Sequence, residues 1–278
     1  MTNLIISFCE GRHDIAFLSR ILNISGFKSY GKKLKNFPSP LNKQYEKELM
    51  SKNISDSKLG FQTNYKVPAD ALYKGDTLAL FHDLGGDGKI AERKEILSMY
   101  QKLIGKSEED EFSSKFDMSF RFIYFFDADN IGIKPRVDAL NNELGLSINI
   151  EHDKILKIDG YEWGCYIFHK DENGGDLEDI LVDLMTKDNE SIFKSCTKYL
   201  STNLISDERR KEYICTEECE SYKSSSKFKI KKSLISVAGQ LQFSGMSNAV
   251  IISNSDYIKK NDLEENIHCV NIKNLFSY

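Results

Sequence analysis

Acidic side chains recur directly after apolar segments of this sequence. Glu10 follows an apolar run over residues 3–9, and Asp127 and Asp129 follow a run of aromatic and aliphatic residues over 120–126. Carboxylates crowded together repel one another and raise each other's pKa, so a cluster of them favours a bound cation. Mg2+ and Mn2+ take carboxylate oxygens and leave positions for phosphate and water, which suits phosphoryl transfer. These three acids are the candidate catalytic residues.

Other acids lie where helices are expected to begin. Asp14 and Glu178 each lie at the start of a segment of helical periodicity. An acid in the first turn of a helix commonly caps it or interacts with its dipole, so each has a structural interpretation beside a functional one. Asp83 and Asp87 follow another apolar run, over residues 77–82. Acids therefore mark the ends of several expected strands.

The acids need elements that bring them together. Apolar segments over 3–9, 77–82, 120–126 and 161–168 alternate with segments of helical periodicity. Strands that alternate with helices predict an α/β fold with a mainly parallel sheet flanked by helices. In such sheets the carboxyl ends of the strands share one edge, where ligands bind. We therefore expect the acids to meet at that edge.

Composition and length set the outer limits. The chain has 278 residues, 40% of them hydrophobic and 29% charged, which is typical of a globular protein. We expect an α/β catalytic domain over residues 1–185, interrupted by a Lys-rich insertion at about 28–75, and a mainly helical region over 186–278. No apolar run approaches the ~20 residues of a membrane span, so a cytoplasmic location with no membrane contact is expected.

The net charge of −4 argues against a protein that coats nucleic acid through bulk electrostatics. Lysines nevertheless gather in two stretches, and they either bind the phosphate backbone of a nucleic acid or form a solvated surface. The candidates are Lys32, Lys33, Lys35, Lys229, Lys231 and Lys232. Phosphate contacts carry little sequence information, so no base specificity is expected.

Two motifs resemble the Toprim superfamily. Residues 8–14 read Phe-Cys-Glu-Gly-Arg-His-Asp and resemble the Glu-Gly-x-x-Asp element that opens Toprim domains. Residues 125–132 read Phe-Phe-Asp-Ala-Asp-Asn-Ile-Gly and resemble their Asp-x-Asp element with its following glycine. Gly85 and Gly86 match the glycine turn between these elements, so the resemblance spans about residues 3–180. The interval between the two motifs is longer than in compact Toprim domains.

A third segment resembles one group of proteins within the Toprim superfamily. Residues 174–181 read Gly-Gly-Asp-Leu-Glu-Asp-Ile-Leu and resemble a Leu-Glu-Asp element of stand-alone Toprim-like proteins related to nucleases of the overcoming-lysogenization-defect (OLD) type. The resemblance implies a Rossmann-like Toprim fold and a nuclease that hydrolyses DNA or RNA with Mg2+ or Mn2+. It further implies an anti-phage defence effector. No phosphate-binding loop of the Gly-x-x-x-x-Gly-Lys-Ser/Thr type is present, so ATP dependence would require a separate ATPase or regulatory partner.

The resemblance also implies roles for individual residues. Glu10 would be a metal ligand or general acid/base, while Asp127 and Asp129 would hold the principal ion. Asp14 and Glu178 would help to hold a second ion, so that two ions clamp one phosphodiester. Two other interpretations stay open: a Toprim module that binds nucleic acid without cleaving it, and a regulatory subunit whose acids hold a stabilising ion. The oligomeric state is open too, a homo-oligomer included.

Overall fold

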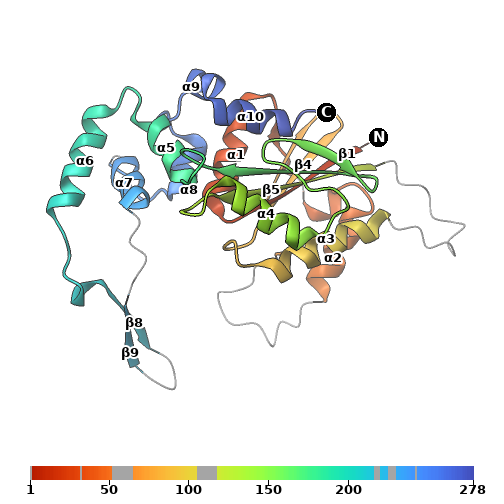
Figure 1. The fold of residues 1–278 in the computed structure, drawn as a ribbon, viewed down its shortest axis with the longest axis horizontal. Coiled ribbons are helices and arrows are strands. Elements are labelled where there is room, and N and C mark those ends of the chain that lie inside the picture. The colour runs from red at the N-terminus through yellow and green to blue at the C-terminus, as the bar shows by residue number, and fades with distance from the viewer. Residues whose placement is uncertain are drawn as a thin grey trace, which may run out of the picture.

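The computed structural model describes residues 2–31, 33–51, 65–104, 118–215, 220–224, 230–241 and 243–278. A seven-stranded mixed sheet forms its centre, with the strand order β2-β3-β4-β1-β5-β7-β6 (Figure 1). The four central strands run parallel: β4 (Thr77–Asp83), β1 (Thr2–Cys9), β5 (Met118–Asp127) and β7 (Tyr161–Phe168). The α/β class with a mostly parallel sheet flanked by helices is therefore confirmed.

Three strands outside the parallel centre pair antiparallel with their neighbours, and the sequence analysis did not identify them. They are β2 (Lys28–Ser29), β3 (Asp70–Lys74) and β6 (Ile155–Ile158). The two ends of the insertion expected over about 28–75 form β2 and β3, which belong to the sheet. Short strands with one solvent-facing side carry a weak pattern, so they resemble loops in sequence.

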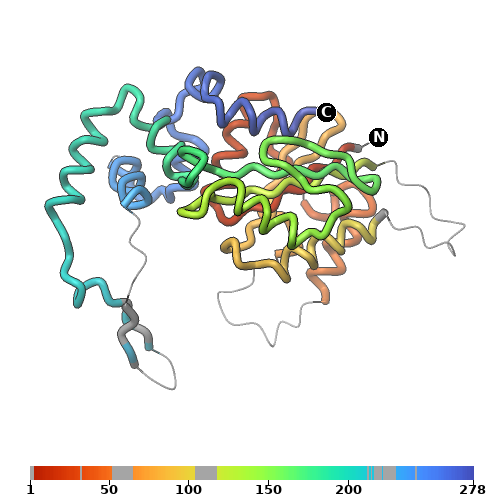
Figure 2. Tube along the Cα trace, viewed as in Figure 1, coloured from red at the N-terminus to blue at the C-terminus, as the bar shows by residue number. Residues whose placement is uncertain are grey.

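Helices cover both faces of the sheet (Figures 1 and 2). One face carries α1 (Arg12–Ile24), α5 (Leu177–Thr186), α8 (Asn248–Asn254) and α10 (Ile267–Leu275). The other carries α2 (Leu41–Met50), α3 (Ile90–Ile104) and α4 (Ile133–Leu144), with the short 3-10 helix η1 (Leu34–Asn36) beside α2. Because both faces are covered, the central strands are apolar almost without alternation, as in 118–127.

The region after residue 186 supplies more helices and one hairpin. Its helices are α6 (Glu190–Thr202), α7 (Ile230–Gly239), α8, α9 (Lys260–Glu265) and α10, with the 3-10 helix η3 (Glu208–Arg210). The hairpin pairs β8 (Lys211–Cys215) with β9 (Glu220–Ser224), which the expectation of a mainly helical region did not include. Among the described residues, no helix is both long and apolar enough to cross a membrane.

The described residues of this C-terminal region share the core of the sheet and its helices. Ile251, Ile272 and Phe276 are buried in the same hydrophobic cluster as Ile5 and Phe17 of β1 and α1. Polar contacts join the same parts of the chain. Arg20 of α1 donates hydrogen bonds to the carbonyls of Ser253, Ser255 and Ile258, and Arg121 of β5 donates to those of Leu275 and Ser277. Residue 185 therefore does not separate two hydrophobic cores.

Candidate active site

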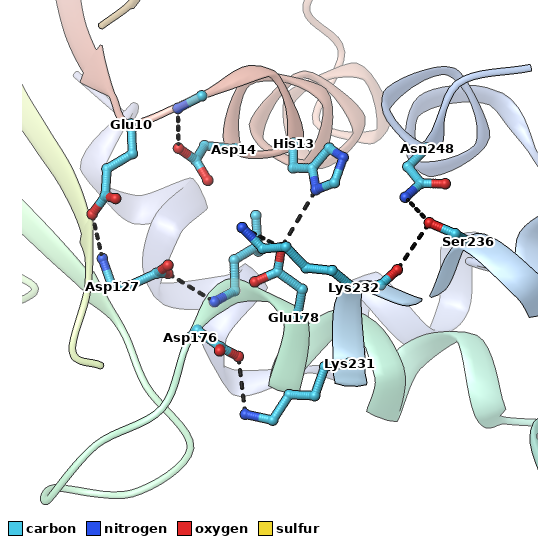
Figure 3. A network of polar contacts seen from close by, with 12 residues as sticks. Glu10, His13, Asp14, Asp127, Asp176, Glu178, Lys231, Lys232, Ser236 and Asn248 are labelled. Atoms are coloured by element: carbon cyan, nitrogen blue, oxygen red, sulfur yellow. Dashed lines mark hydrogen bonds and ion pairs between the residues drawn. The ribbon is translucent and has the colours of Figure 1, made fainter. Parts of the chain in front are cut away.

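Glu10 and Asp127 meet where β1 and β5 end. The two strands are parallel neighbours, with Phe8 opposite Tyr124 in the register, so the residues that follow them emerge at one edge of the sheet. The backbone N–H of Asp127 donates to Oε1 of Glu10 at 3.0 Å (Figure 3). β1 lies between β4 and β5, and β4 connects through α3 to β5 on the far side of β1. This is the kind of crevice in which α/β sheets bind ligands.

A glycine turn holds the backbone of Glu10. Gly85 and Gly86, which follow β4, have φ of +71° and +130°, a region that side chains with a Cβ rarely adopt. In that conformation the N–H of Gly86 donates to the carbonyl of Glu10 at 2.8 Å, and the N–H of Leu84 donates to that of Cys9 at 3.1 Å. The turn therefore fixes the end of β1 from the side opposite to β5.

Two loops join on the other side of Asp127. The N–H of Gly175 donates to the carbonyl of Asp129 at 2.8 Å, and the N–H of Leu177 donates to Oδ1 of Asp127 at 2.8 Å. Gly175 has φ of +124°, and a Cβ there would lie 2.2 Å from the backbone nitrogen of Lys170. Only glycine fits this approach. The two segments that the sequence analysis singled out, around 127 and 178, are thereby placed side by side.

Asp14 and Glu178 complete the cluster from two helices. Asp14 is the third residue of α1, 7% exposed, and its Oδ2 accepts from the N–H of Gly11 at 2.7 Å, so it also caps the helix. Glu178, in the first turn of α5, is only 2% exposed. Its Oε1 lies 3.4 Å from Nδ1 of His13 and 3.4 Å from Nζ of Lys232 (Figure 3).

The second oxygen of Glu178 has no protein partner. Oε2 is buried and accepts no hydrogen bond within the described part of the chain. A buried carboxylate oxygen without a donor costs free energy, roughly 1–3 kcal/mol and more for a charged group. An oxygen of this kind, next to other carboxylates, is suited to bind a cation.

The carboxylates perturb one another. Burial raises the pKa of Asp127 to about 8, and the charges of Glu10 and Asp14 act in the same direction. Burial also raises the pKa of Asp14 to about 7, helped by the charges of Glu10 and Glu178. The pKa of Glu10 is raised as well, chiefly by burial. For Glu178 burial acts upward too, but His13 and Lys232 outweigh it and lower its pKa. The surroundings therefore do not stabilise all of these carboxyl groups in their ionised form.

Asp129 does not join this cluster as closely. Its side chain is 41% exposed, and Oδ2 accepts from Arg136 at 2.8 Å. Its backbone has φ of +48°, the left-handed conformation that Asp tolerates better than most residues. The same guanidinium donates to Oδ2 of Asp87 and to the backbone carbonyl of Asp127. Arg136, which the sequence analysis missed, therefore sits at the entrance of the site.

The lysines divide into separate groups. Lys231 pairs with Asp176 at 3.1 Å and Asp179 at 2.5 Å, and Lys232 pairs with Glu178. Lys33 and Lys35 are exposed beside η1, and within the described residues no ion pair joins either one to the carboxylates. Lys32 and Lys229 lie outside the described residues. The structure thus brings part of the second lysine stretch to the site.

Two cavities have basic side chains in their walls. One of about 560 Å³ is bordered by Asp129, Lys170 and Lys231, and another of about 560 Å³ by Arg12 and Lys89. Arg12 also pairs with Asp83 at 2.7 Å. The cavities had no signal in the sequence, because their walls come from loops distant along the chain.

Oxygen donors of this kind suit a hard divalent ion. Among the described residues, however, no three His, Cys, Asp or Glu side chains form a group that could hold a metal ion as they stand. Glu10, Asp14, Asp127 and Glu178 interact electrostatically rather than converge on one point. The residues fit such an ion in their chemistry, and binding it would require their carboxylates to turn towards a common centre.

Comparisons with known proteins bear on the fold. No family model matches the sequence, and no curated protein matches it. A crystal structure of a hypothetical protein from Pyrococcus horikoshii OT3 is similar over 100% of both chains, with a TM-score of 0.56 and 13% sequence identity. At that identity the similarity concerns the fold alone.

Proposed function

We propose that this chain is a Toprim-type nuclease that hydrolyses phosphodiester bonds of nucleic acid with Mg2+ or Mn2+. The observation that carries the proposal is the buried, unpartnered Oε2 of Glu178 beside the carboxylates of Glu10, Asp14 and Asp127. Acids with raised pKa values at the carboxyl ends of parallel strands are typical of functional sites. The motifs around Glu10 and Asp127 add the resemblance to Toprim domains.

The residues support distinct parts of such a reaction. A bound divalent ion would polarise the phosphate and lower the pKa of the attacking water. In the roles that the resemblance implies, Asp127 and Asp129 would hold one ion, Asp129 after release from Arg136, and Asp14 and Glu178 would hold a second. Glu10, whose pKa burial raises, is suited to accept and return a proton during the reaction.

The basic residues around the carboxylates would bind the substrate. Arg12 and Lys89 border one cavity and Lys170 borders the other. Their charges would hold successive phosphates so that the scissile bond lies over Glu10 and Asp127. Contacts of this type do not distinguish DNA from RNA. A role in phage defence and a separate ATPase partner rest on the resemblance alone.

The test is a cleavage assay on plasmid DNA, single-stranded DNA and total tRNA with Mg2+ or Mn2+. Wild type is compared with Glu10→Gln and Asp127→Asn, which keep the side-chain size and remove the charge. We expect both variants to lose at least about a hundredfold in rate, as for loss of an acid–base group. Asp188→Asn is the matched control, because Asp188 is exposed and pairs only with Lys259 in the described structure.

The outcomes separate the alternatives. Cleavage that persists in EDTA or in both site variants would overturn the metal-dependent mechanism at this site. If wild type binds nucleic acid without cutting any of the three substrates, the non-cleaving Toprim module replaces the nuclease proposal.

A further inference from the structure

Helix α7 directs two consecutive lysines towards the first turn of α5. Lys231 pairs with Asp176 and Asp179, the two acids that form the capping box of α5. Lys232 instead pairs with Glu178, and its charge also acts on Asp14. The neighbouring lysines therefore have different partners: Lys231 contacts the cap of the helix, and Lys232 contacts the carboxylate cluster (Figure 3).

Lys232 faces the carboxylates that the proposed second ion would use. Asp14 and Glu178 are both more than nine-tenths buried, whereas the side chain of Lys232 is 49% exposed. The ammonium group of Lys232 lies at Oε1 of Glu178, and a divalent ion at the neighbouring Oε2 would be repelled by it. The ammonium group and a divalent ion therefore compete for the carboxylate of Glu178.

The surroundings allow Lys232 to leave without moving α7. Its backbone carbonyl accepts from Oγ of Ser236, which in turn accepts from Asn248 of α8 at 2.7 Å. The helix stays anchored through these contacts and through Lys231. Lys232 also borders a cavity of about 680 Å³, together with Leu204 and Arg210. The long side chain has room to turn there, with its ammonium in water.

We propose that Lys232 is a built-in competitor of the second divalent ion, so that ion binding to Asp14 and Glu178 and release of Lys232 from Glu178 are one event. The inference rests on the proposed metal-dependent function and concerns the regulation of the same site. It makes the ion affinity of the α/β domain depend on a helix from the region after residue 186. At low concentrations of divalent ion the lysine holds the acids.

The experiment compares wild type, Lys232→Met and Lys231→Met as full-length proteins. Free Mn2+ is titrated by electron paramagnetic resonance, and the melting temperature is followed in parallel with Mn2+ or EDTA. Methionine keeps the length of the side chain and removes its charge. We expect Lys232→Met to bind the weaker Mn2+ ion on the order of tenfold more tightly, because a charge that competes with the ion is gone. Lys231→Met is expected to change that affinity far less.

A second measurement uses the wild-type protein and does not depend on the folding of a variant. Reductive methylation followed by mass spectrometry reports how accessible each lysine is. We expect Mn2+ to increase the labelling of Lys232 several-fold relative to Lys231, because its partner Glu178 has been taken by the ion.

The outcomes distinguish this inference from the proposed function. Mn2+ that binds wild type and Lys232→Met with equal affinity, and leaves the labelling of Lys232 unchanged, overturns the competition and leaves the nuclease proposal standing. Failure of both proteins to bind Mn2+ at all would overturn the two together. Tighter binding in Lys231→Met equal to that in Lys232→Met would also overturn the inference, since it would indicate a general effect of charge.

Discussion

At the scale of single residues, Asp127 combines a structural contact with a chemical one. Its backbone N–H donates to Glu10 and its Oδ1 accepts from the N–H of Leu177. The first bond holds the side chain of Glu10 at the backbone of Asp127, and the second holds the side chain of Asp127 at the start of α5. In this position burial and the neighbouring acids raise the pKa of the Asp127 carboxyl group to about 8.

We predict that the apo protein loses stability as the pH rises. Asp127 and Asp14 have folded-state pKa values of about 8 and about 7, above the ordinary 3.8. Their contribution is therefore fully present below about pH 4 and is lost as the pH rises through 7 to 8. Below pH 6.5 His82, His152 and His268 act in the opposite direction, because burial lowers their pKa values to about 4. The melting temperature in EDTA should therefore fall between pH 6.5 and 8.5, with a loss of stability on the order of 2 kcal/mol. Scanning calorimetry across this range measures it.

Asp127→Asn serves as the control for that prediction, because an amide does not ionise. Its melting temperature should depend less on pH than that of wild type. Mn2+ added at pH 8 should stabilise wild type by binding only the folded state. A wild-type melting temperature that rises steadily from pH 6.5 to 8.5 in EDTA would contradict the environment described for these acids.

A second residue-scale prediction concerns Arg93. Its guanidinium makes two bonds to Glu143 of α4 at 2.8 and 2.6 Å and one to the carbonyl of Asp87, and both side chains are under 8% exposed. Removing one partner leaves a buried charge, so Arg93→Met should cost about 3–5 kcal/mol. Urea denaturation measures it. Arg93→Met with Glu143→Leu should recover much of the loss, whereas an equally unstable double variant would show that packing, not charge, dominates.

The sequence predicted the positions of the acids better than it predicted the residues that pair with them. Glu10 and Asp127 were expected at one sheet edge because each follows an apolar strand, and Glu178 was expected on resemblance to a motif; all three lie together. Asp129 was expected beside Asp127, but its left-handed backbone and Arg136 keep it outward. Such pairings depend on loop conformation, which spacing along the chain does not determine.

At the scale of elements, long buried strands and helices were predictable and short edge elements were not. The runs over 77–82 and 161–168 correspond to β4 and β7, and the periodic segment 90–104 is α3. The short apolar segments at 250–253 and 268–272 are both helical. They are too short for their period to distinguish a helix from a strand.

The junction between the loop after β5 and the loop before α5 yields a prediction. Gly175→Ala adds a Cβ that would lie 2.2 Å from the nitrogen of Lys170, at φ of +124°. We expect the hydrogen bond from Gly175 to Asp129 to be lost, with a destabilisation of several kcal/mol, about 2–4. The stability measured by chemical denaturation and the affinity for Mn2+ should both fall, because the junction places Glu178 beside Asp127.

Gly145→Ala is the matched control. Gly145 follows α4 with φ of +59°, yet a Cβ there meets nothing within 4 Å. It should cost only the strain of the left-handed conformation, about 1–2 kcal/mol, and leave Mn2+ binding intact. Equal losses in the two variants would mean that backbone strain alone, not the close approach of the loops, explains the effect.

At the scale of the whole molecule, the region after residue 186 completes the core. Apolar side chains of α8 and α10 are buried in the cluster formed by α1 and the sheet. Each buried side chain of this type contributes about 1.5–3 kcal/mol, and total stabilities are about 5–15 kcal/mol. We therefore predict that a fragment of residues 1–185 does not fold cooperatively. Near-UV circular dichroism and thermal denaturation would detect this.

A replacement of residues 211–224 by a flexible linker is the control for the truncation. β8 and β9 pair only with each other in the described sheets, and their ends at Lys211 and Ser224 are adjacent. That variant should retain a cooperative transition. A fragment 1–185 that unfolds cooperatively would show instead that the first part of the chain is an independent domain.

The cover that α8 and α10 place over α1 has a consequence for biosynthesis. α1 leaves the ribosome near the start of translation, and α8 begins only at Asn248. At ~5–20 residues per second, the apolar surface of α1 waits on the order of ten seconds or more for its cover. A nascent chain therefore carries every acid of the candidate site before this cover is available. A polypeptide released early would keep the apolar surface of α1 exposed to chaperones and proteases.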